Sequence, residues 1–282
     1  MIRHYSGGSS TTTDELGLVP GGTYVIGTDR PWIPADGEGP ARVVELEPFR
    51  IAPCAVTVAE FATFVDATGF VTDAERAGWS FVFASEVDDG AMIAGRAAEA
   101  PWWLGVEGAS WRDALDTNPD HPVVHVSWND AEAYCRWRGA RLPTEAEWEA
   151  AASGGVPGRT FPWGEELTAG GTHRCNVWQG SFPTNDTGDD GFRGRAPVDA
   201  FPPNDFGLYN MVGNVWEWCA DALGRTSSPS TCCAPASQGA ERVKKGGSYL
   251  CHSSYCARYR IQARTGSSPD SSTGNVGFRI AR

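Results

Sequence analysis

The stretch DHPVVHVSWNDAEAYCRWRGARLPTEAEWEAAASGG, residues 120–155, contains the clearest secondary-structure signals in the chain. The β-branched run over residues 123–127 predicts a short strand. A helix is expected to follow, capped by Asn129 or Asp130, because short polar side chains accept hydrogen bonds from the free N–H groups of a first helical turn. Gly139 is expected to end this helix. The stretch thus predicts a strand, a helix and, after the glycine, a second helix.

Capping boxes mark the starts of two helices. In a capping box, a Thr side chain and a Glu three residues later each accept a hydrogen bond from the other residue's backbone N–H. Thr144 and Glu147 form this pattern in the quoted stretch, and Thr57 and Glu60 form it nearer the N-terminus. Each helix is expected to end at a glycine in the left-handed conformation: Gly69 and Gly154.

The rest of the chain reads as loops and short strands. The 34 glycines and 19 prolines are spread widely, which indicates many turns and short elements. Short strands are predicted within 18–28, as a pair across a Pro-Gly-Gly turn, and at 42–52, 174–179, 242–248 and 276–281. Residues 1–16 are polar and rich in Gly, Ser and Thr, so a disordered tail is expected there. The remaining residues, 17–282, are expected to form one compact α+β domain.

Composition bounds the class of protein. With 282 residues, 41% apolar content, 12 Trp and 12 Phe, the chain can bury a sizeable core. It has no apolar run of about 18 residues and no apolar leader, so a cytoplasmic protein without a membrane span is expected. The net charge of −12 disfavours a nucleic-acid partner. This charge is uneven, since residues 241–282 carry eight Lys and Arg against two acidic residues.

The cationic segment contains a pair of cysteines. In KKGGSYLCHSSYCARYR, residues 244–260, Cys251 and Cys256 stand five positions apart. This spacing puts them on different faces of a helix and opposite faces of a strand, so their sulfurs can meet only if residues 252–255 form a turn. Nearby cations favour a thiolate, the form that attacks or binds metals. Four interpretations remain open: two unrelated buried thiols, a structural disulfide, half of a zinc site, or a reactive pair.

Segments covering nearly all of residues 18–282 resemble, in one order, the formylglycine-generating enzymes. They are PGGTYVIGT, VTVAEFATFVDATGFVTDAERAGWSFVF, HPVVHVSWNDAEAYCRWRGARLPTEAEWEAAASGG, NVWQGSFP, DTGDDGFRGRAPVDAFPPNDFGLYNMVGNVWEW, RVKKGGSYLCHSSYCARYR and SSPDSSTGNVGFRIA. The resemblance implies a modified C-type-lectin-like fold with little regular secondary structure. Lectin-like binding proteins and the sulfoxide-forming enzymes of ergothioneine synthesis share much of this scaffold. The specific signal is therefore the cysteine pair in GGSYLCHSSYC.

The resemblance also implies an activity. Family members use O2 to oxidise a cysteine in an unfolded sulfatase C-x-P-x-R segment to Cα-formylglycine. By this resemblance Cys251 and Cys256 would hold Cu(I), the substrate cysteine would add as a third ligand, and an external thiol would supply electrons. The other implied residues line the site or face the substrate: Ser248, Tyr255, Trp216, Asn275 and His252. Packing alone also explains buried Tyr and Trp side chains.

Two structural calcium sites are implied as well. The oxygen-rich loop TNDTGDDGF, residues 184–192, misses the EF-hand spacing, and as a bare pattern it is typical of a surface turn. By resemblance, the first site would use the side chains of Asn176 and Asp190 and the backbone oxygens of Val177 and Phe192. The second would use the side chains of Asn210 and Glu217 and the backbone of Gly213 and Val215.

The chain departs from the family at several positions. Ile261 and Ile280 stand where secreted members carry disulfide cysteines, which leaves Cys135 without its expected partner. This favours a bacterial-type cytoplasmic protein, and a monomer is expected. Ser253 replaces a basic residue often found in the family. The adjacent cysteines of the Ser/Thr/Pro-rich loop at 226–237 have no predicted role: Cys232 and Cys233.

Other function classes remain open from the sequence. A non-catalytic lectin-like binding module would keep Cys251 and Cys256 as a structural disulfide and take up no copper. A non-haem iron oxygenase would need a His-rich facial ligand set, and the chain has only five His. A structural zinc site would need four ligands, with a second pair at short spacing.

Overall fold

The computed structural model describes residues 16–114, 118–224 and 240–282. Its α-helices are α1 (Val58–Thr68), α2 (Asp73–Ala77), α3 (Trp128–Trp137) and α4 (Glu145–Ser153), and its 3-10 helices are Pro34–Asp36, Ala84–Glu86 and Trp111–Ala114. The strands are β1 (Gly17–Val19), β2 (Gly22–Ile26), β3 (Arg42–Leu46), β4 (Phe49–Ile51), β5 (Trp79–Phe83), β6 (Ile93–Arg96), β7 (Trp103–Glu107), β8 (Thr168–Ala169), β9 (Thr172–His173), β10 (Gly180–Ser181), β11 (Asn185–Asp186), β12 (Trp216–Ala222), β13 (Arg242–Lys245), β14 (Arg264–Ser267) and β15 (Val276–Gly277).

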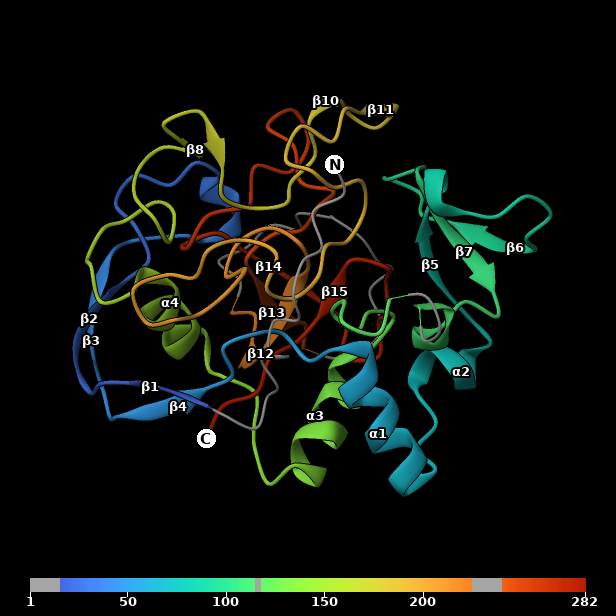
Figure 1. Ribbon diagram of the computed structural model, residues 1–282, viewed down its shortest axis with the longest axis horizontal. Helices are drawn as coiled ribbons and strands as arrows, with labels where there is room; N and C mark the ends of the chain where they lie inside the picture. Colours follow the sequence, from blue (N-terminus) through green and yellow to red (C-terminus); the bar gives the residue numbers. More distant parts are fainter. Residues whose placement is uncertain (1–15, 115–117, 225–239) are drawn as a thin grey trace, which may run out of the picture.

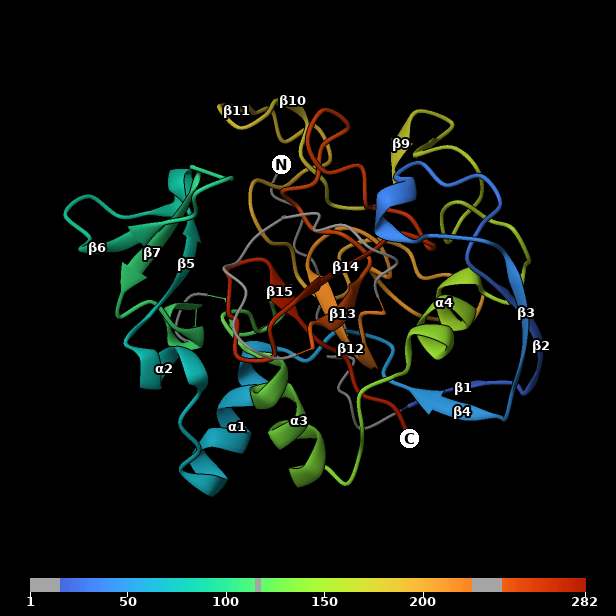
Figure 2. The same cartoon turned by 180° about the vertical axis from the view of Figure 1, so that it is seen from behind.

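A four-stranded sheet of order β14-β13-β12-β15 lies at the centre of the molecule. β12 pairs antiparallel with β13 and parallel with β15. The main core surrounds it and includes Trp148 of α4, Trp218 of β12 and Phe278, each almost fully buried. Figures 1 and 2 show the sheet of order β5-β7-β6 at one edge of the molecule and the β2–β3 ribbon at the opposite edge. The central sheet therefore lies between two smaller β units.

The predicted helix starts agree largely with the structure. Both predicted capping boxes, Thr57 with Glu60 and Thr144 with Glu147, are confirmed at the starts of α1 and α4. The predicted cap of α3 was wrong by two or three residues. Its N-cap is Ser127, whose backbone N–H donates to the Asp130 carboxylate while its side chain accepts from the Asp130 N–H. Ser127 and Asp130 thus form a capping box that was not predicted, as do Thr72 and Glu75 at the start of α2.

The predicted strand at 123–127 was wrong. The segment is buried but carries no named strand, because His125 has a φ of 57°, which turns the chain out of the extended conformation. The backbone N–H of His125 donates to the Thr273 carbonyl at 3.0 Å and not to a regularly paired neighbouring strand. The His125 ring is held by the Ser80 hydroxyl, 2.8 Å from Nδ1. The turn therefore joins α3 to the loop before β15.

Strand pairing also differs from the prediction. The strands flanking the Pro-Gly-Gly turn do not pair with each other, since β1 pairs with β4 and β2 with β3. The predicted strand at 42–52 is interrupted between β3 and β4, and residues 174–179 form no strand. Segments predicted at 242–248 and 276–281 are strands only in their first residues, β13 and β15. Short strands and long loops agree with the predicted low content of regular structure.

The N-terminal tail and several cysteines were also the subject of predictions. The predicted tail at 1–16 lies outside the described residues except for Leu16, which is buried, and Cys232 and Cys233 also lie outside them. Cys135 is a buried free thiol, and Ile261 and Ile280 pack in the main core. Within the described part of the chain, no helix is long and apolar enough to cross a membrane.

Several cations of the C-terminal segment are buried in ion pairs. A solvated surface would be the simplest expectation for such a cluster of charges. Instead, these side chains reach carboxylates far away in the sequence, and their shortest N···O distances are as follows: Lys245–Glu149, 2.7 Å; Arg258–Asp36, 2.5 Å; Arg260–Glu38, 2.5 Å; Arg279–Glu217, 2.6 Å. These pairs tie the C-terminal loops to α4, β12 and the loop before β3.

Candidate active site at the cysteine pair

The segment after β13 folds into the turn that the cysteine spacing requires. Gly246 and Gly247 have φ values of 93° and 74°, and a Cβ on Gly247 would lie 2.9 Å from Tyr259 Cα, so this stretch packs directly on the chain that returns from the turn. The Cys256 N–H donates to the His252 carbonyl at 2.8 Å. Residues 252–255 therefore form the predicted turn.

The turn brings the two sulfurs together. The Sγ atoms of Cys251 and Cys256 lie 3.1 Å apart, and the residues are 1% and 3% exposed. Neither cysteine forms a disulfide bond in this structure. A disulfide bond is about 2.05 Å long, so the sulfurs are in contact without being bonded. The interpretation as two unrelated thiols is thereby excluded.

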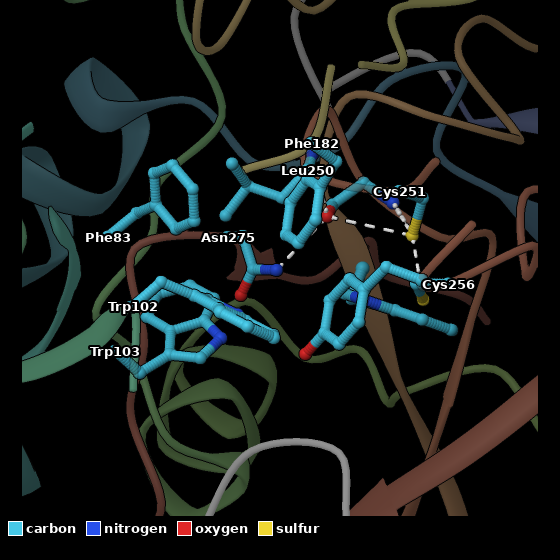
Figure 3. Close-up of a pocket in the computed structure, with 11 residues that line it drawn as sticks. Phe83, Trp102, Trp103, Phe182, Leu250, Cys251, Cys256 and Asn275 are labelled. Atoms are coloured by element: carbon cyan, nitrogen blue, oxygen red, sulfur yellow. Dashed lines mark hydrogen bonds between the residues drawn. The ribbon is translucent and has the colours of Figure 1, made fainter. Parts of the chain in front are cut away.

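Different donors surround each sulfur. The Ser248 backbone N–H donates to Cys251 Sγ at 3.3 Å, and the Ser248 hydroxyl lies 4.0 Å from the same sulfur. Asn275 Nδ2 donates to the Ser248 hydroxyl oxygen at 3.0 Å, as Figure 3 shows. Cys256 Sγ accepts from the Cys251 thiol and from a guanidinium, with Arg258 Nη1 3.7 Å away. A cation thus lies beside Cys256, whereas the donors described at Cys251 are neutral.

The sulfurs form part of a pocket walled by aromatic rings. Figure 3 shows Cys251 and Cys256 on one side and Trp102 and Trp103 on the other. The complete lining is Phe83, Trp102, Trp103, Phe182, Trp216, Ser248, Leu250, Cys251, Tyr255, Cys256 and Asn275. The Tyr255 ring stacks on Phe182 with centroids 4.6 Å apart and meets the edge of Trp102 at 4.8 Å. The pocket is therefore apolar, with its polar groups concentrated around the sulfurs.

Most residues predicted for the site lie together. Six of the seven line this pocket: Cys251, Cys256, Ser248, Tyr255, Trp216 and Asn275. The seventh, His252, is half-buried in the turn, where its Nδ1 lies 2.8 Å from the Ser254 hydroxyl, and it is not among the lining residues. The backbone N–H of Ser254 also donates to this Nδ1. His252 thus has a visible role in shaping the turn.

Sequence reasoning missed four aromatic wall residues: Phe83, Trp102, Trp103 and Phe182. Phe83 ends β5, Trp103 begins β7 and Phe182 lies in the hairpin between β10 and β11. These segments are remote from the cysteine turn in sequence. The available signal was aromatic density in two segments, PWW at 101–103 and SFP at 181–183, which by itself predicts burial only.

The donor set decides which metal the pair fits. Across residues 16–114, 118–224 and 240–282, no group of three or more His, Cys, Asp or Glu side chains is arranged to hold a metal. A four-ligand zinc site or an iron facial triad is therefore not assembled from the described residues. Two adjacent sulfurs in an apolar pocket suit a soft ion of low coordination number, such as Cu(I).

The residues predicted for the first calcium site also lie together. The Asp190 carboxylate accepts from the Val177 N–H at 3.1 Å and from the Phe192 N–H at 3.0 Å. The Gln179 side-chain amide contacts both the Val177 carbonyl oxygen and Asp190 Oδ2. Asn176 Nδ2 donates to the Gly194 carbonyl. The four predicted residues and Gln179 thus close the base of the loop that carries Phe182.

The second set of calcium residues is more mixed. Asn210 Oδ1 is buried and accepts no hydrogen bond from the described residues, which fits a ligand atom. Both oxygens of Glu217 are already engaged, since Arg279 binds them at 2.6 and 2.7 Å and Trp148 Nε1 donates to one at 2.7 Å. Gly213 and Val215 lie in the loop between them. Calcium binding at either place stays a prediction.

Fold and site together define a protein of modified C-type-lectin-like fold with a dithiol at the wall of an aromatic pocket. Residues 5–282 match the family described as the sulfatase-modifying factor enzyme 1-like domain, so the chain belongs to this family. It is 55% identical to the formylglycine-generating enzyme of Thermomonospora curvata, over 93% of this chain and 91% of that one. The predicted family and the predicted α+β fold class are thereby confirmed.

Two further similarities bound what this membership means. The chain is 44% identical to a protein of Bos taurus named inactive C-alpha-formylglycine-generating enzyme 2, over 97% of this chain and 89% of that one. The structure of PvdO from Pseudomonas aeruginosa superposes with a TM-score of 0.66 at 26% identity, covering 95% and 93% of the two chains. Since a relative at 44% identity is named inactive, similarity alone does not establish activity, and the residues of the site have to be considered.

Proposed function

We propose that this protein is a formylglycine-generating enzyme, which oxidises a cysteine of an unfolded sulfatase C-x-P-x-R segment to Cα-formylglycine with O2. The observation that carries the proposal is the contact of two buried cysteine sulfurs that form no disulfide, 3.1 Å apart, at the wall of an aromatic pocket. A scaffold kept only for binding has no need of two unbonded thiols in contact. Similarity to proteins named for this activity supports the same assignment.

The proposed reaction has a definite balance. The Cβ–S bond and one Cβ–H bond of the substrate cysteine break, a C=O bond forms, and sulfur leaves as hydrogen sulfide. Dioxygen accepts four electrons, two from the substrate and two from a pair of external thiols that join as a disulfide, and the net products besides the aldehyde are one hydrogen sulfide, one water and that disulfide. Cu(I) held by Cys251 and Cys256 would supply the one-electron chemistry that O2 requires. The protein is expected to work as a cytoplasmic monomer.

The Ser248 hydroxyl is oriented to donate a hydrogen bond toward sulfur. Its hydroxyl oxygen accepts from Asn275 Nδ2 at 3.0 Å and from the Leu250 N–H at 3.3 Å. A hydroxyl has two acceptor lone pairs and one donor hydrogen. With both acceptor positions engaged, its hydrogen is left to point at Cys251 Sγ or at a group entering the pocket. Asn275 is itself oriented by the Thr273 hydroxyl, which donates to its Oδ1 at 2.7 Å.

The aromatic wall of the pocket orients side chains near the sulfurs and excludes water from them. Tyr255 is fixed between Phe182 and Trp102, so its ring is held beside Cys256 with little freedom. Trp216, at the start of β12, is a further aromatic residue of the lining. Such rings contact an entering peptide over a large apolar area and exclude water, which strengthens every polar interaction inside the pocket. We assign Tyr255 the role of a hydrogen-bond donor to the reacting sulfur or oxygen.

The test is a direct conversion assay. The protein, loaded anaerobically with Cu(I), is mixed with O2, a thiol reductant and a C-x-P-x-R peptide, and the peptide is followed by mass spectrometry. We expect the mass change of a thiol side chain becoming an aldehyde, capture of that aldehyde by a hydroxylamine probe, and release of hydrogen sulfide. The alternative, a binding module with a structural disulfide, predicts no conversion and no free thiols at positions 251 and 256.

We further propose that Ca²⁺ fixes the two loops described above. If it binds the native state alone, calcium at about 100 times its Kd adds ~2.7 kcal/mol, which raises the Tm by about 5 °C. We expect a chelator to remove this increment from the wild type and from Asp189→Asn, a residue of the same loop that is exposed and is not among the predicted ligands. In Asp190→Asn calcium should stabilise less. An unchanged Tm on chelation of the wild type would refute the proposal.

A further inference from the structure

Arg258 connects one sulfur of the pair to a distant carboxylate. Its Nε and Nη2 lie 2.5 and 3.0 Å from the two carboxylate oxygens of Asp36, and its Nη1 lies 3.7 Å from Cys256 Sγ. The side chains of Arg258 and Asp36 are 8% and 1% exposed. The guanidinium is planar, so a two-point grip on Asp36 fixes the direction of its remaining N–H groups. One of those groups points at the sulfur.

The carboxylate that binds Arg258 belongs to the N-terminal part of the chain. Asp36 ends the 3-10 helix Pro34–Asp36, and 222 positions separate it from Arg258. The backbone donor to Cys251 is the N–H of Ser248, only three positions earlier in the chain. Cys256 accepts from the Cys251 thiol and from Arg258, whose position depends on Asp36. The two sulfurs are therefore held by different means, one local and one long-range.

We propose that Arg258 and Asp36 are positioning residues for the cysteine pair. The N–H group of Arg258 fixes the rotamer of Cys256, so that its sulfur faces Cys251 and the two can share one soft ion. This inference rests on the proposed function, because the shared ion is part of that proposal. Outer-shell partners that orient metal ligands cost about 10- to 100-fold in metal affinity when they are replaced.

The chain provides a matched control two residues further on. Arg260 forms an equivalent buried pair with Glu38, at 2.5 and 3.1 Å, from the same two segments. Its Nε donates to the Ala257 carbonyl, and none of its described hydrogen bonds reaches a sulfur. The side chains of Arg260 and Glu38 are 1% and 0% exposed. Breaking this pair should loosen the same loop without touching Cys256.

The experiment compares the two pairs in the full chain. Cu(I) affinity is measured anaerobically by competition with a chromophoric chelator, and the free energy of unfolding by urea titration, for Arg258→Met, Arg258→Lys and Asp36→Asn against Arg260→Met and Glu38→Gln. We expect about tenfold weaker Cu(I) binding or more in the Arg258 and Asp36 variants. Arg260 and Glu38 variants should lose comparable stability but keep the wild-type affinity. Arg258→Lys, which keeps the charge without the fork, should also bind weakly.

The outcomes separate this inference from the proposed function. Wild-type protein that binds no Cu(I) would overturn the proposed function itself. Tight binding by the wild type and by Arg258→Met alike would overturn only the positioning role. Equal loss of affinity in both sets of variants would show that the loop acts as general structural support, which also overturns it. Should Arg258→Met fail to fold, Arg258→Lys and Asp36→Asn decide the question.

Discussion

Replacing Cys251 or Cys256 with alanine should reduce peptide conversion by far more than about a hundredfold, the upper range seen when an outer-shell partner of a metal ligand is lost. Each substitution removes one of only two sulfurs that meet at 3.1 Å in the pocket. A single thiol can neither hold a two-coordinate soft ion nor close a disulfide. The conversion assay measures this loss directly, and Cu(I) competition should show weak binding in both variants.

Cys135→Ala is the control for this pair. Cys135 is also a buried free thiol, but it lies on α3 in the main core, and burial raises the pKa of its thiol. Its removal should leave conversion unchanged and cost about 1 kcal/mol of unfolding free energy, as other small core truncations do. Persistent turnover in either Cys251→Ala or Cys256→Ala would contradict the assigned site, whatever the control shows.

The parts of the structure that sequence predicted well are local. A capping box depends on residues three positions apart, so Thr57 and Thr144 could be recognised without any tertiary information. The spacing of Cys251 and Cys256 indicated that a turn would be needed for their sulfurs to meet, which is again a local inference. In contrast, the strand expected at 123–127 fails because of one backbone angle at His125, which a β-branched run gives no reason to expect.

The parts that sequence did not predict are long-range. The pocket walls join β5, β7, the β10–β11 hairpin and the cysteine turn, and no spacing rule relates those segments. The basic C-terminal segment raised the expectation of cations near the thiols, yet only Arg258 has a described hydrogen bond to one of them. Lys245 and Arg279 instead reach Glu149 and Glu217, which a charge count cannot show.

Arg279→Met should cost about 3–5 kcal/mol of unfolding free energy, the range found when one partner of a buried ion pair is removed. Arg279 is 0% and Glu217 2% exposed, and the guanidinium holds both carboxylate oxygens. It also donates to three backbone carbonyls, of Ala52, Pro53 and Tyr209. Its loss would leave a buried carboxylate with only Trp148 as a described donor. Urea unfolding should show a lower midpoint with an unchanged slope.

The source of this cost can be separated by two comparisons. Arg136→Met breaks an exposed pair with Glu132, at 3.7 Å, and should cost less than about 0.5 kcal/mol. Adding Glu217→Met to Arg279→Met removes the unpaired charge, so the double variant should be more stable than the single one.

Calcium gives a further comparison, because an ion at Asn210 and Glu217 would neutralise the same carboxylate and shrink the loss of unfolding free energy in Arg279→Met. In calcium-free buffer, a loss as small as that of Arg136→Met would contradict the role assigned to the Arg279–Glu217 pair.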